Sequence, residues 1–212
     1  MSYSEFEARI RKIAVLPIVL PKSVSFCIDV IGALAEGGAT GIEIVLRSKD
    51  ALPAIEAGRK TFPAMVFGAG TVLTPAQYDA AVAAGADFAI SPGFAPELVA
   101  YAASRPVPLI PGVQTATEVI AARSAGAALL KFYPSEPAGG TAVLSDYGNV
   151  FPDVSFMPSG KIDLHLLPGY SALRNVASVG GTWMYTKAGE LLPRERISSV
   201  MKQSLQAMER GE

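Results

Sequence analysis

A repeated pattern of helix, stop signal and short strand is the feature that most constrains the fold of this 212-residue chain. One helix rich in small residues ends at Ala84-Gly85-Ala86, and another ends at Ala125-Gly126-Ala127. A short apolar run follows each stop, at residues 87–90 and 129–134, and each run is closed by a proline. Alternation of this kind is typical of βα units that build a parallel sheet.

Apolar runs and cap signals extend this pattern along the chain. A regular apolar stripe predicts helices at 2–12 and 23–36 and a last helix from Pro193. Cap residues or a proline in the first turn predict three more helices, which begin after Thr74, Ala95 and Thr115. With no break in composition and no long linker, we expect a single domain over residues 1–212. The natural closure is a (β/α)8 TIM barrel with an extra N-terminal helix, and an open doubly wound sheet is the second choice. The eight expected strands lie at 13–20, 41–46, 64–67, 87–90, 107–110, 129–134, 154–157 and 176–179.

Composition excludes several classes of function. The formal net charge is -1, which offers no basic surface to nucleic acid. A single cysteine, Cys27, excludes an internal disulfide, and a single histidine, His165, leaves too few soft ligands for a zinc site. No signal peptide opens the chain and no segment approaches the length of a membrane span, so we expect a cytoplasmic protein with no membrane partner.

One lysine, Lys131, stands in the buried run at 129–134, where a strand should carry no charge. One interpretation is structural, with the ammonium at a strand end reaching water or pairing with a carboxylate such as Glu43. The other is chemical, because a buried lysine held as a free amine is the nucleophile of Schiff-base enzymes, and Glu43 would then be its proton shuttle. Both remain open from these residues alone.

Other polar residues fall where strands end, which is where barrels of this kind hold their active sites. The planar guanidinium of Arg47 suits a carboxylate, with the Thr71 hydroxyl as a second donor. Glycines after the last two strands, at Gly160 and at Gly180-Gly181-Thr182, suit a phosphate held by backbone N–H groups. They are equally compatible with ordinary turns.

Taken together, these motifs resemble the family of 2-keto-3-deoxy-6-phosphogluconate (KDPG) and 4-hydroxy-2-oxoglutarate (KHG) aldolases. The likeness covers nearly the whole chain, with the motifs in family order. The matching segments are Gly41-Ile42-Glu43-Ile44-Val45-Leu46-Arg47, Gly68-Ala69-Gly70-Thr71-Val72-Leu73, Phe88-Ala89-Ile90-Ser91-Pro92-Gly93, Pro108-Leu109-Ile110-Pro111-Gly112, Lys131-Phe132-Tyr133-Pro134, Gly139-Gly140 and Gly180-Gly181-Thr182-Trp183.

The resemblance implies a homotrimeric class I aldolase that acts on a small 2-keto acid and needs neither metal nor organic cofactor. Lys131 would form the imine and Glu43 would be the general acid and base. Arg47, Thr71 and Pro92 would hold the pyruvate carboxylate, and Tyr133 would pack on the substrate. The products would be pyruvate and glyceraldehyde 3-phosphate, or pyruvate and glyoxylate if the substrate is 4-hydroxy-2-oxoglutarate. The phosphate-binding residues would be Ser159, Gly160, Lys161, Gly181 and Thr182.

The departures from the family pattern lie together after the seventh strand. Ser159-Gly160-Lys161 stands where the family usually has Thr-Gly-Gly, so the lysine could crowd the phosphate or supply a charge to it. Pro168-Gly169 should leave the next helix short or shifted. Two hypotheses of another class also remain: a non-covalent sugar-phosphate isomerase or epimerase barrel, in which Lys131 has no covalent role, and a barrel that binds anions without turning them over.

Overall fold

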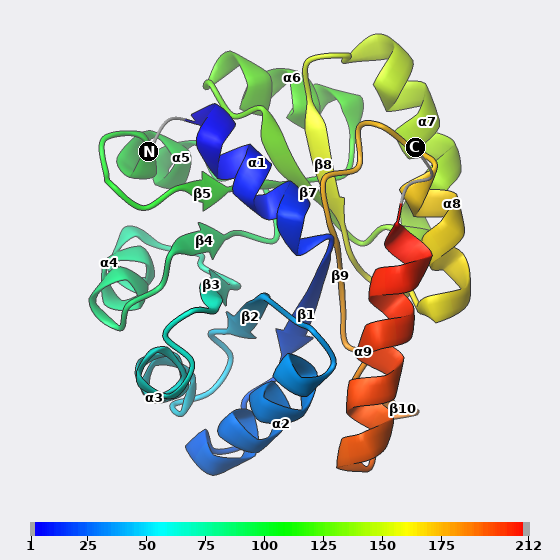
Figure 1. Cartoon of the computed structure of the whole chain (residues 1–212). Coiled ribbons are helices and arrows are strands. Elements are labelled where there is room, and N and C mark those ends of the chain that lie inside the picture. The colour runs from blue at the N-terminus through cyan, green and yellow to red at the C-terminus, as the bar shows by residue number, and fades with distance from the viewer. Residues whose placement is uncertain (1–2, 210–212) are drawn as a thin grey trace.

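The computed structural model describes residues 3–209 and has an α/β fold (Figure 1). Its helices alternate with short strands along most of the chain. The helices are α1 (Tyr3–Ile13), α2 (Val24–Glu36), α3 (Ala51–Thr61), α4 (Pro75–Ala83), α5 (Pro96–Ala103), α6 (Ala116–Ser124), η1 (Glu136–Ala138), α7 (Gly140–Val150), η2 (Leu164–Leu166), α8 (Leu167–Ser171) and α9 (Arg194–Met208). The strands are β1 (Val15–Val19), β2 (Gly41–Val45), β3 (Val66–Gly70), β4 (Phe88–Ile90), β5 (Leu109–Ile110), β6 (Gly112–Val113), β7 (Leu129–Phe132), β8 (Ser155–Pro158), β9 (Val179–Gly181), β10 (Thr186–Lys187) and β11 (Glu190–Leu191).

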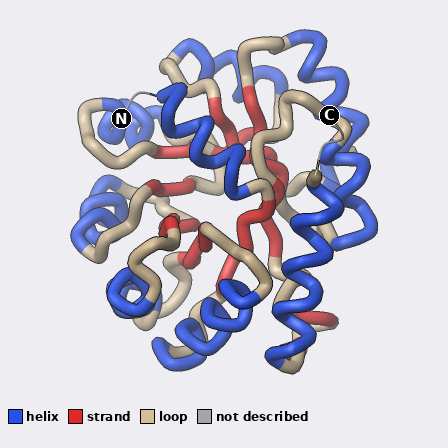
Figure 2. Tube along the Cα trace, in the orientation of Figure 1, coloured by secondary structure: helices blue, strands red, loops and turns tan. Residues whose placement is uncertain are grey.

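The central strands are parallel and form a curled sheet with helices outside it (Figure 2). One run of pairing has the order β5-β4-β3-β2-β1-β9, and a second has the order β6-β7-β8. Isolated parallel bridges join Phe156 to Val176 and Ser159 to Gly180. Because the strands are parallel, their carboxyl ends and the loops that follow them gather at one edge.

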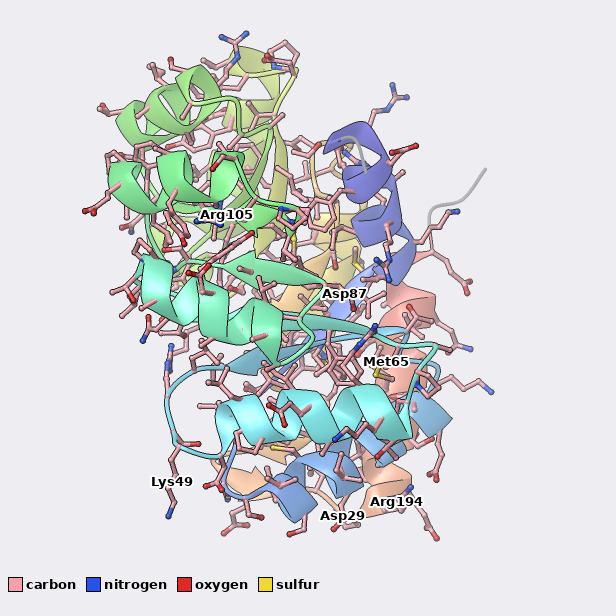
Figure 3. All side chains as sticks on the ribbon, turned by 90° about the vertical axis from the view of Figure 1, so that its left-hand side faces the viewer. Asp29, Lys49, Met65, Asp87, Arg105 and Arg194 are labelled. Carbon is pink, nitrogen blue, oxygen red and sulfur yellow. The ribbon has the colours of Figure 1, made fainter. Side chains whose placement is uncertain are left out.

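Helix α1 covers the opposite edge, where the strands begin. Phe6, Ile10 and Ile13 of α1 are buried in one cluster with inward side chains of the strands, such as Leu16 and Leu129. In Figure 3, Met65 and Asp87, which precede β3 and β4, lie near α1, whereas Lys49, which follows β2, lies at the other edge. A helix is thus present where one was predicted at 2–12, although residue 2 lies outside the described residues.

Local signals placed most helix ends correctly. Ser23 and Thr74 accept hydrogen bonds from backbone N–H groups in the first turns of α2 and α4, and Thr115 forms the predicted capping box with Glu118. The predicted helix at 96–103 has the bounds of α5. The starts of α2, α4 and α6 were predictable because each cap joins residues only three positions apart.

Three strands differ from the prediction. Strand β3 covers Val66–Gly70 instead of 64–67, because Gly68 to Gly70 pair in register with Glu43 to Val45. The strand expected at 107–110 is split into β5 and β6 on either side of Pro111, which has no N–H to pair. The last strand, β9, is Val179–Gly181 rather than 176–179, since these residues pair with β1.

Helices α3 and α7 and the β10–β11 hairpin were not predicted. Proline in the first turn of α3 and glycine at the start of α7 are poor signals for a helix, and tertiary packing overrides them. The expected shortening after the seventh strand is confirmed, because only the 3₁₀ turn η2 and the five-residue α8 follow. Pro168 lies in the first turn of α8, so it begins that helix instead of breaking it.

Asp87 ties the sheet to two basic side chains at the edge near α1. Its carboxylate accepts a hydrogen bond from the Phe67 backbone N–H at 2.8 Å and pairs with Arg59 at 3.1 Å and with Arg9 of α1 at 3.7 Å. Replacing Asp87 by Asn removes the charge while keeping the size. We expect the free energy of unfolding, measured by urea titration, to fall by about 1 to 3 kcal/mol.

Asp153 provides the comparison for that measurement. It pairs with Arg123 in solvent, with more than half of each side chain exposed, so Asp153→Asn should have a smaller effect. If Asp153→Asn lowered the free energy of unfolding as much as Asp87→Asn, the contacts of Asp87 with Phe67, Arg59 and Arg9 would not be specially stabilising.

Cys27 is a buried thiol in α2, with no exposed surface. Burial, and secondarily the negative charge of Asp50, raise the pKa of Cys27 from 9.0 to about 11. The folded state therefore favours the protonated thiol, and its contribution to stability is present below pH 9.0 and is lost as pH rises toward 11. We expect an aromatic disulfide reagent to label Cys27 at pH 8 only after urea unfolding; rapid labelling of the native protein would contradict this.

Candidate active site

A cavity of about 350 Å³ opens where the strands end. It lies at the edge away from α1, next to the loops that follow β2, β3, β7, β8 and β9. Every site residue predicted from the sequence lines this cavity. They are Glu43, Arg47, Thr71, Pro92, Lys131, Tyr133, Ser159, Gly160, Lys161, Gly181 and Thr182.

Lys131 and Glu43 meet inside the cavity. Nζ of Lys131 donates a hydrogen bond to Oε1 of Glu43 at 3.2 Å, although the two residues come from β7 and β2. Lys131 is 8% exposed and Glu43 is 1% exposed. A buried amine in contact with a buried carboxylate can pass a proton to it and become nucleophilic, so the pair is chemically competent as well as structurally satisfied.

Gly70 explains how Glu43 fits beside β3. A Cβ atom at Gly70 would lie 2.0 Å from Oε1 of Glu43, closer than atoms can approach. Gly70 pairs with Val45 in the β2–β3 ladder, so its bare backbone is fixed against the strand that carries the carboxylate. Position 70 must therefore be glycine, because the Glu43 carboxylate occupies the space that a side chain there would need.

Arg47 and Thr71 form a second polar group at the mouth. Nε of Arg47 donates to the Thr71 hydroxyl at 3.3 Å, and the Arg47 side chain is exposed. Thr71 has a φ of 60°, a left-handed conformation that is uncommon for a β-branched residue. Pro92 closes this side, and Gly112 lets it approach, since a Cβ there would lie 2.3 Å from the Pro92 carbonyl carbon.

Tyr133 stands between the amine and the mouth. The centre of its ring is 5.5 Å from Nζ of Lys131, and 37% of the residue is exposed. It lies two residues after Lys131, on the same face of the chain, as the strand alternation predicted. A planar ring at this position can contact a ligand bound to the amine.

The loops after β8 and β9 form the other end of the cavity. Ser159 is 3% exposed, and its hydroxyl has no hydrogen-bond partner among residues 3–209. Gly160 and Lys161 both have positive φ values, of 104° and 62°, and the Lys161 side chain is exposed. A buried, unpaired hydroxyl that lines the same cavity as a lysine side chain is suited to an anion from outside the chain.

Other lining residues were not singled out from the sequence. Ile18 and Leu20 belong to β1 and the position after it, while Thr186, Ala188 and Gly189 come from the β10–β11 hairpin. The hairpin turn has Ala rather than Asn or Asp before Gly189, so its sequence signal was weak. Within the described part of the chain, no group of three His, Cys, Asp or Glu residues could hold a metal ion, and no helix there is long and apolar enough to span a bilayer.

Trp183 also lines the cavity and is the chain's single tryptophan. Its ring lies over Gly181, where a Cβ would be 2.0 Å from a ring carbon. Its indole Nε1 donates to the Ser204 hydroxyl of α9 at 2.9 Å. The ring therefore links the mouth of the cavity to the last helix.

Comparisons with known proteins identify one family. Residues 6–201 match the model of the KDPG and KHG aldolase family. A 2-dehydro-3-deoxy-phosphogluconate aldolase from Pseudomonas aeruginosa is 39% identical over 94% of this chain and 90% of its own. Among solved structures, the KDPG aldolase of Legionella pneumophila, which holds pyruvate as a covalent carbinolamine, has a TM-score of 0.85 and 35% identity, covering 92% of this chain and 96% of that one. The aldolase of Zymomonas mobilis ZM4 with 3-phosphoglycerate has a TM-score of 0.89 and 32% identity, with 96% of each chain covered.

Proposed function

The chain belongs to the KDPG and KHG aldolase family, and we propose that it is a class I aldolase that cleaves 2-keto-3-deoxy-6-phosphogluconate to pyruvate and glyceraldehyde 3-phosphate. The observation that carries the proposal is the buried contact of 3.2 Å between Nζ of Lys131 and Oε1 of Glu43. A nucleophile with a proton shuttle within hydrogen-bond reach is what imine chemistry requires.

In the first half of the reaction, Lys131 passes a proton to Glu43, and the free amine adds to the C2 ketone of the substrate. The oxygen takes up two protons through Glu43, the one first taken from Lys131 and one that the nitrogen releases after it adds, and it leaves as water, so that a protonated imine remains. In this imine, the positive nitrogen accepts the electron pair released when the C3–C4 bond breaks. The Glu43 carboxylate takes the proton of the C4 hydroxyl, whose oxygen becomes the carbonyl oxygen of the departing aldehyde.

In the second half, an enamine of pyruvate remains on Lys131. Its C3 carbon takes up a proton, with Glu43 as the donor, and the imine forms again. Water then adds to C2 and the C–N bond breaks, which releases pyruvate and the free amine. Glu43 is suited to each transfer because it is within reach of the nitrogen and almost wholly shielded from solvent.

Arg47 and Thr71 provide the donors for the substrate carboxylate. The guanidinium and the hydroxyl already lie 3.3 Å apart at Nε and Oγ1, so both can face one anion. Pro92 lines this region of the cavity. The Tyr133 ring lies near the amine of Lys131, where it would pack against the pyruvate part of the substrate. This arrangement aligns the ketone of a 2-keto acid with Lys131.

The substrate phosphate belongs at the other end, near Ser159, Gly160, Lys161, Gly181 and Thr182. Support comes from the unpaired Ser159 hydroxyl and from the exposed side chain of Lys161, which lines the same cavity. Lys161 keeps a left-handed φ that costs a non-glycine residue free energy. That cost is consistent with a functional reason for a lysine at this position.

We therefore expect Lys161→Met to weaken binding of the phosphorylated substrate. The variant keeps most of the side-chain volume and removes the charge, so KM for 2-keto-3-deoxy-6-phosphogluconate should rise about tenfold. Steady-state kinetics on the phosphorylated and unphosphorylated substrates, and on 4-hydroxy-2-oxoglutarate, would measure the effect. Lys187→Met on the exposed hairpin is the matched control. A lower KM for the phosphorylated substrate would instead mean that Lys161 obstructs this end.

We also propose that residues 1–212 form one (β/α)8 barrel domain, with α1 as its extra helix. Strands β5 and β6 are consecutive in the chain and are separated only by Pro111, so the two runs of paired strands adjoin there. At the other side, parallel bridges join Phe156 to Val176 and Ser159 to Gly180, which connects the end of the second run to β9 of the first. One hydrophobic cluster extends from Val15 to Met208. A homotrimer in the cytoplasm completes the proposal, on the basis of family membership.

Trapping with borohydride tests the function directly. The protein is incubated with pyruvate and sodium borohydride, and peptides are analysed by mass spectrometry for a reduced adduct on Lys131. We expect complete and specific modification of that lysine, which a non-covalent isomerase or epimerase would not show. An unmodified Lys131, under conditions that trap a known class I aldolase, would exclude the covalent mechanism.

A further inference from the structure

A chain of hydrogen bonds lies behind the phosphate end of the cavity, in residues outside its lining. The Tyr170 hydroxyl donates to a carboxylate oxygen of Glu136 and lies 2.7 Å from the Ser135 hydroxyl. A phenol has only one proton to donate, so Ser135 must be the donor to the Tyr170 oxygen. The order is therefore Ser135 to Tyr170 to Glu136, and it begins with two side chains that are wholly buried.

The same segment holds the loop that lines the cavity. The backbone N–H of Ser135 donates to the carbonyl of Ser159 at 2.8 Å, and that of Glu136 donates to the carbonyl of Gly160 at 3.2 Å. Tyr170 comes from α8, beyond this loop in the chain. Its hydroxyl thus fixes residues 135 and 136, whose N–H groups in turn fix Ser159 and Gly160.

Lys131 is held by different contacts. Its backbone N–H donates to the Pro111 carbonyl at 2.9 Å, and it stands opposite Met157 in the β7–β8 ladder. These are bonds within the sheet, and none of them passes through Tyr170. Loss of the Tyr170 hydroxyl should consequently disturb the loop and leave the amine in place.

We propose that Tyr170 is a positioning residue that sets the geometry of the Ser159–Gly160 loop, and so the affinity for the phosphate end of the substrate, without acting on the imine half. The inference rests on the proposed function. Gly140 is part of the same device, since a Cβ there would lie 2.6 Å from Oε1 of Glu136 and 3.2 Å from the Tyr170 oxygen. Burial, and then the bond to Glu136, raise the pKa of Tyr170 above its ordinary 10.0, which keeps the hydroxyl protonated in any ordinary assay.

Tyr170→Phe removes the hydroxyl and leaves the ring. We expect KM for 2-keto-3-deoxy-6-phosphogluconate to rise about tenfold, as for a lost hydrogen bond to a charged group. The rate at which pyruvate and borohydride modify Lys131 should stay within twofold of the native rate. Glu136→Ala should reproduce the increase in KM. Glu136→Gln keeps an acceptor oxygen for the Tyr170 hydroxyl, so its KM should stay close to the native value.

Tyr78→Phe is the matched control. Tyr78 is equally buried and donates its hydroxyl proton to a backbone carbonyl, but it lies in α4 and its bond is to Val107, not to the segment at 135–136. Equal KM values in the Tyr170→Phe and Tyr78→Phe proteins would overturn the proposal, and so would a parallel loss of trapping and of phosphate affinity. If the native protein does not trap pyruvate at all, the proposed function itself fails, which is a separate result.

Discussion

Replacing Lys131 by Met should lower kcat/KM for 2-keto-3-deoxy-6-phosphogluconate by at least about 10⁴-fold, because the change removes the buried amine that forms the imine next to Glu43. Methionine matches the lysine stem in volume and cannot attack a ketone. Borohydride trapping with pyruvate should disappear in the same protein. Steady-state kinetics and intact-protein mass spectrometry provide the two measurements.

The variant also changes stability, which must be separated from chemistry. Removing the ammonium leaves the Glu43 carboxylate buried without its partner, and that is unfavourable unless the carboxyl takes up a proton. Circular dichroism and urea unfolding should be recorded on each preparation. Lys49→Met is a suitable control, since Lys49 is exposed and does not line the cavity. A folded Lys131→Met protein with more than a hundredth of the native activity would contradict the covalent mechanism.

Glu43→Gln should lower kcat by about 10³-fold, with a smaller change in KM. The amide has the same shape and can still accept a hydrogen bond from Lys131, but it cannot carry a proton between the nitrogen and the substrate. Formation of the imine itself needs proton transfer, so trapping of pyruvate should be slower by a similar factor. Rapid-quench measurement of the adduct, together with steady-state kinetics, tests both statements.

Glu36→Gln gives the matched comparison for the carboxylate. Glu36 is more than half exposed, pairs with Arg194 on the surface and does not line the cavity. Its loss should leave both rates unchanged. If Glu43→Gln traps pyruvate at the native rate but does not turn over substrate, Glu43 acts only after imine formation, and its assigned role in the first half would be wrong.

The parts of the site that the sequence predicted depend on short-range rules. Alternation along a strand placed Lys131 and Glu43 on inward faces, and the topology of parallel strands brought their ends to one edge. The structure joins the two side chains by a hydrogen bond across 88 positions of sequence. Arg47 and Thr71 follow from the same reasoning, because each lies just beyond the end of a strand, whereas the role of Tyr133 was expected only from the family resemblance.

Long-range packing accounts for what the sequence did not predict. Gly68 and Gly70 resemble a loop in isolation, yet they belong to β3 because they pair with β2. Both must be glycine, since Phe88 and Glu43 occupy the space that side chains would need. Tyr170 lies in a segment that departs from the family pattern, and its bonds to Ser135 and Glu136 depend on how α8 docks. Neither contact leaves a periodic signal in the chain.

The place of Trp183 gives the protein an optical property that needs no label. All tryptophan emission of this chain originates from one indole, and that indole lies on the wall of the cavity. A ligand that displaces water from Gly181 or changes the bond to Ser204 would alter the polarity around the ring. We therefore expect the emission of this single indole to report occupancy of the cavity without any added label.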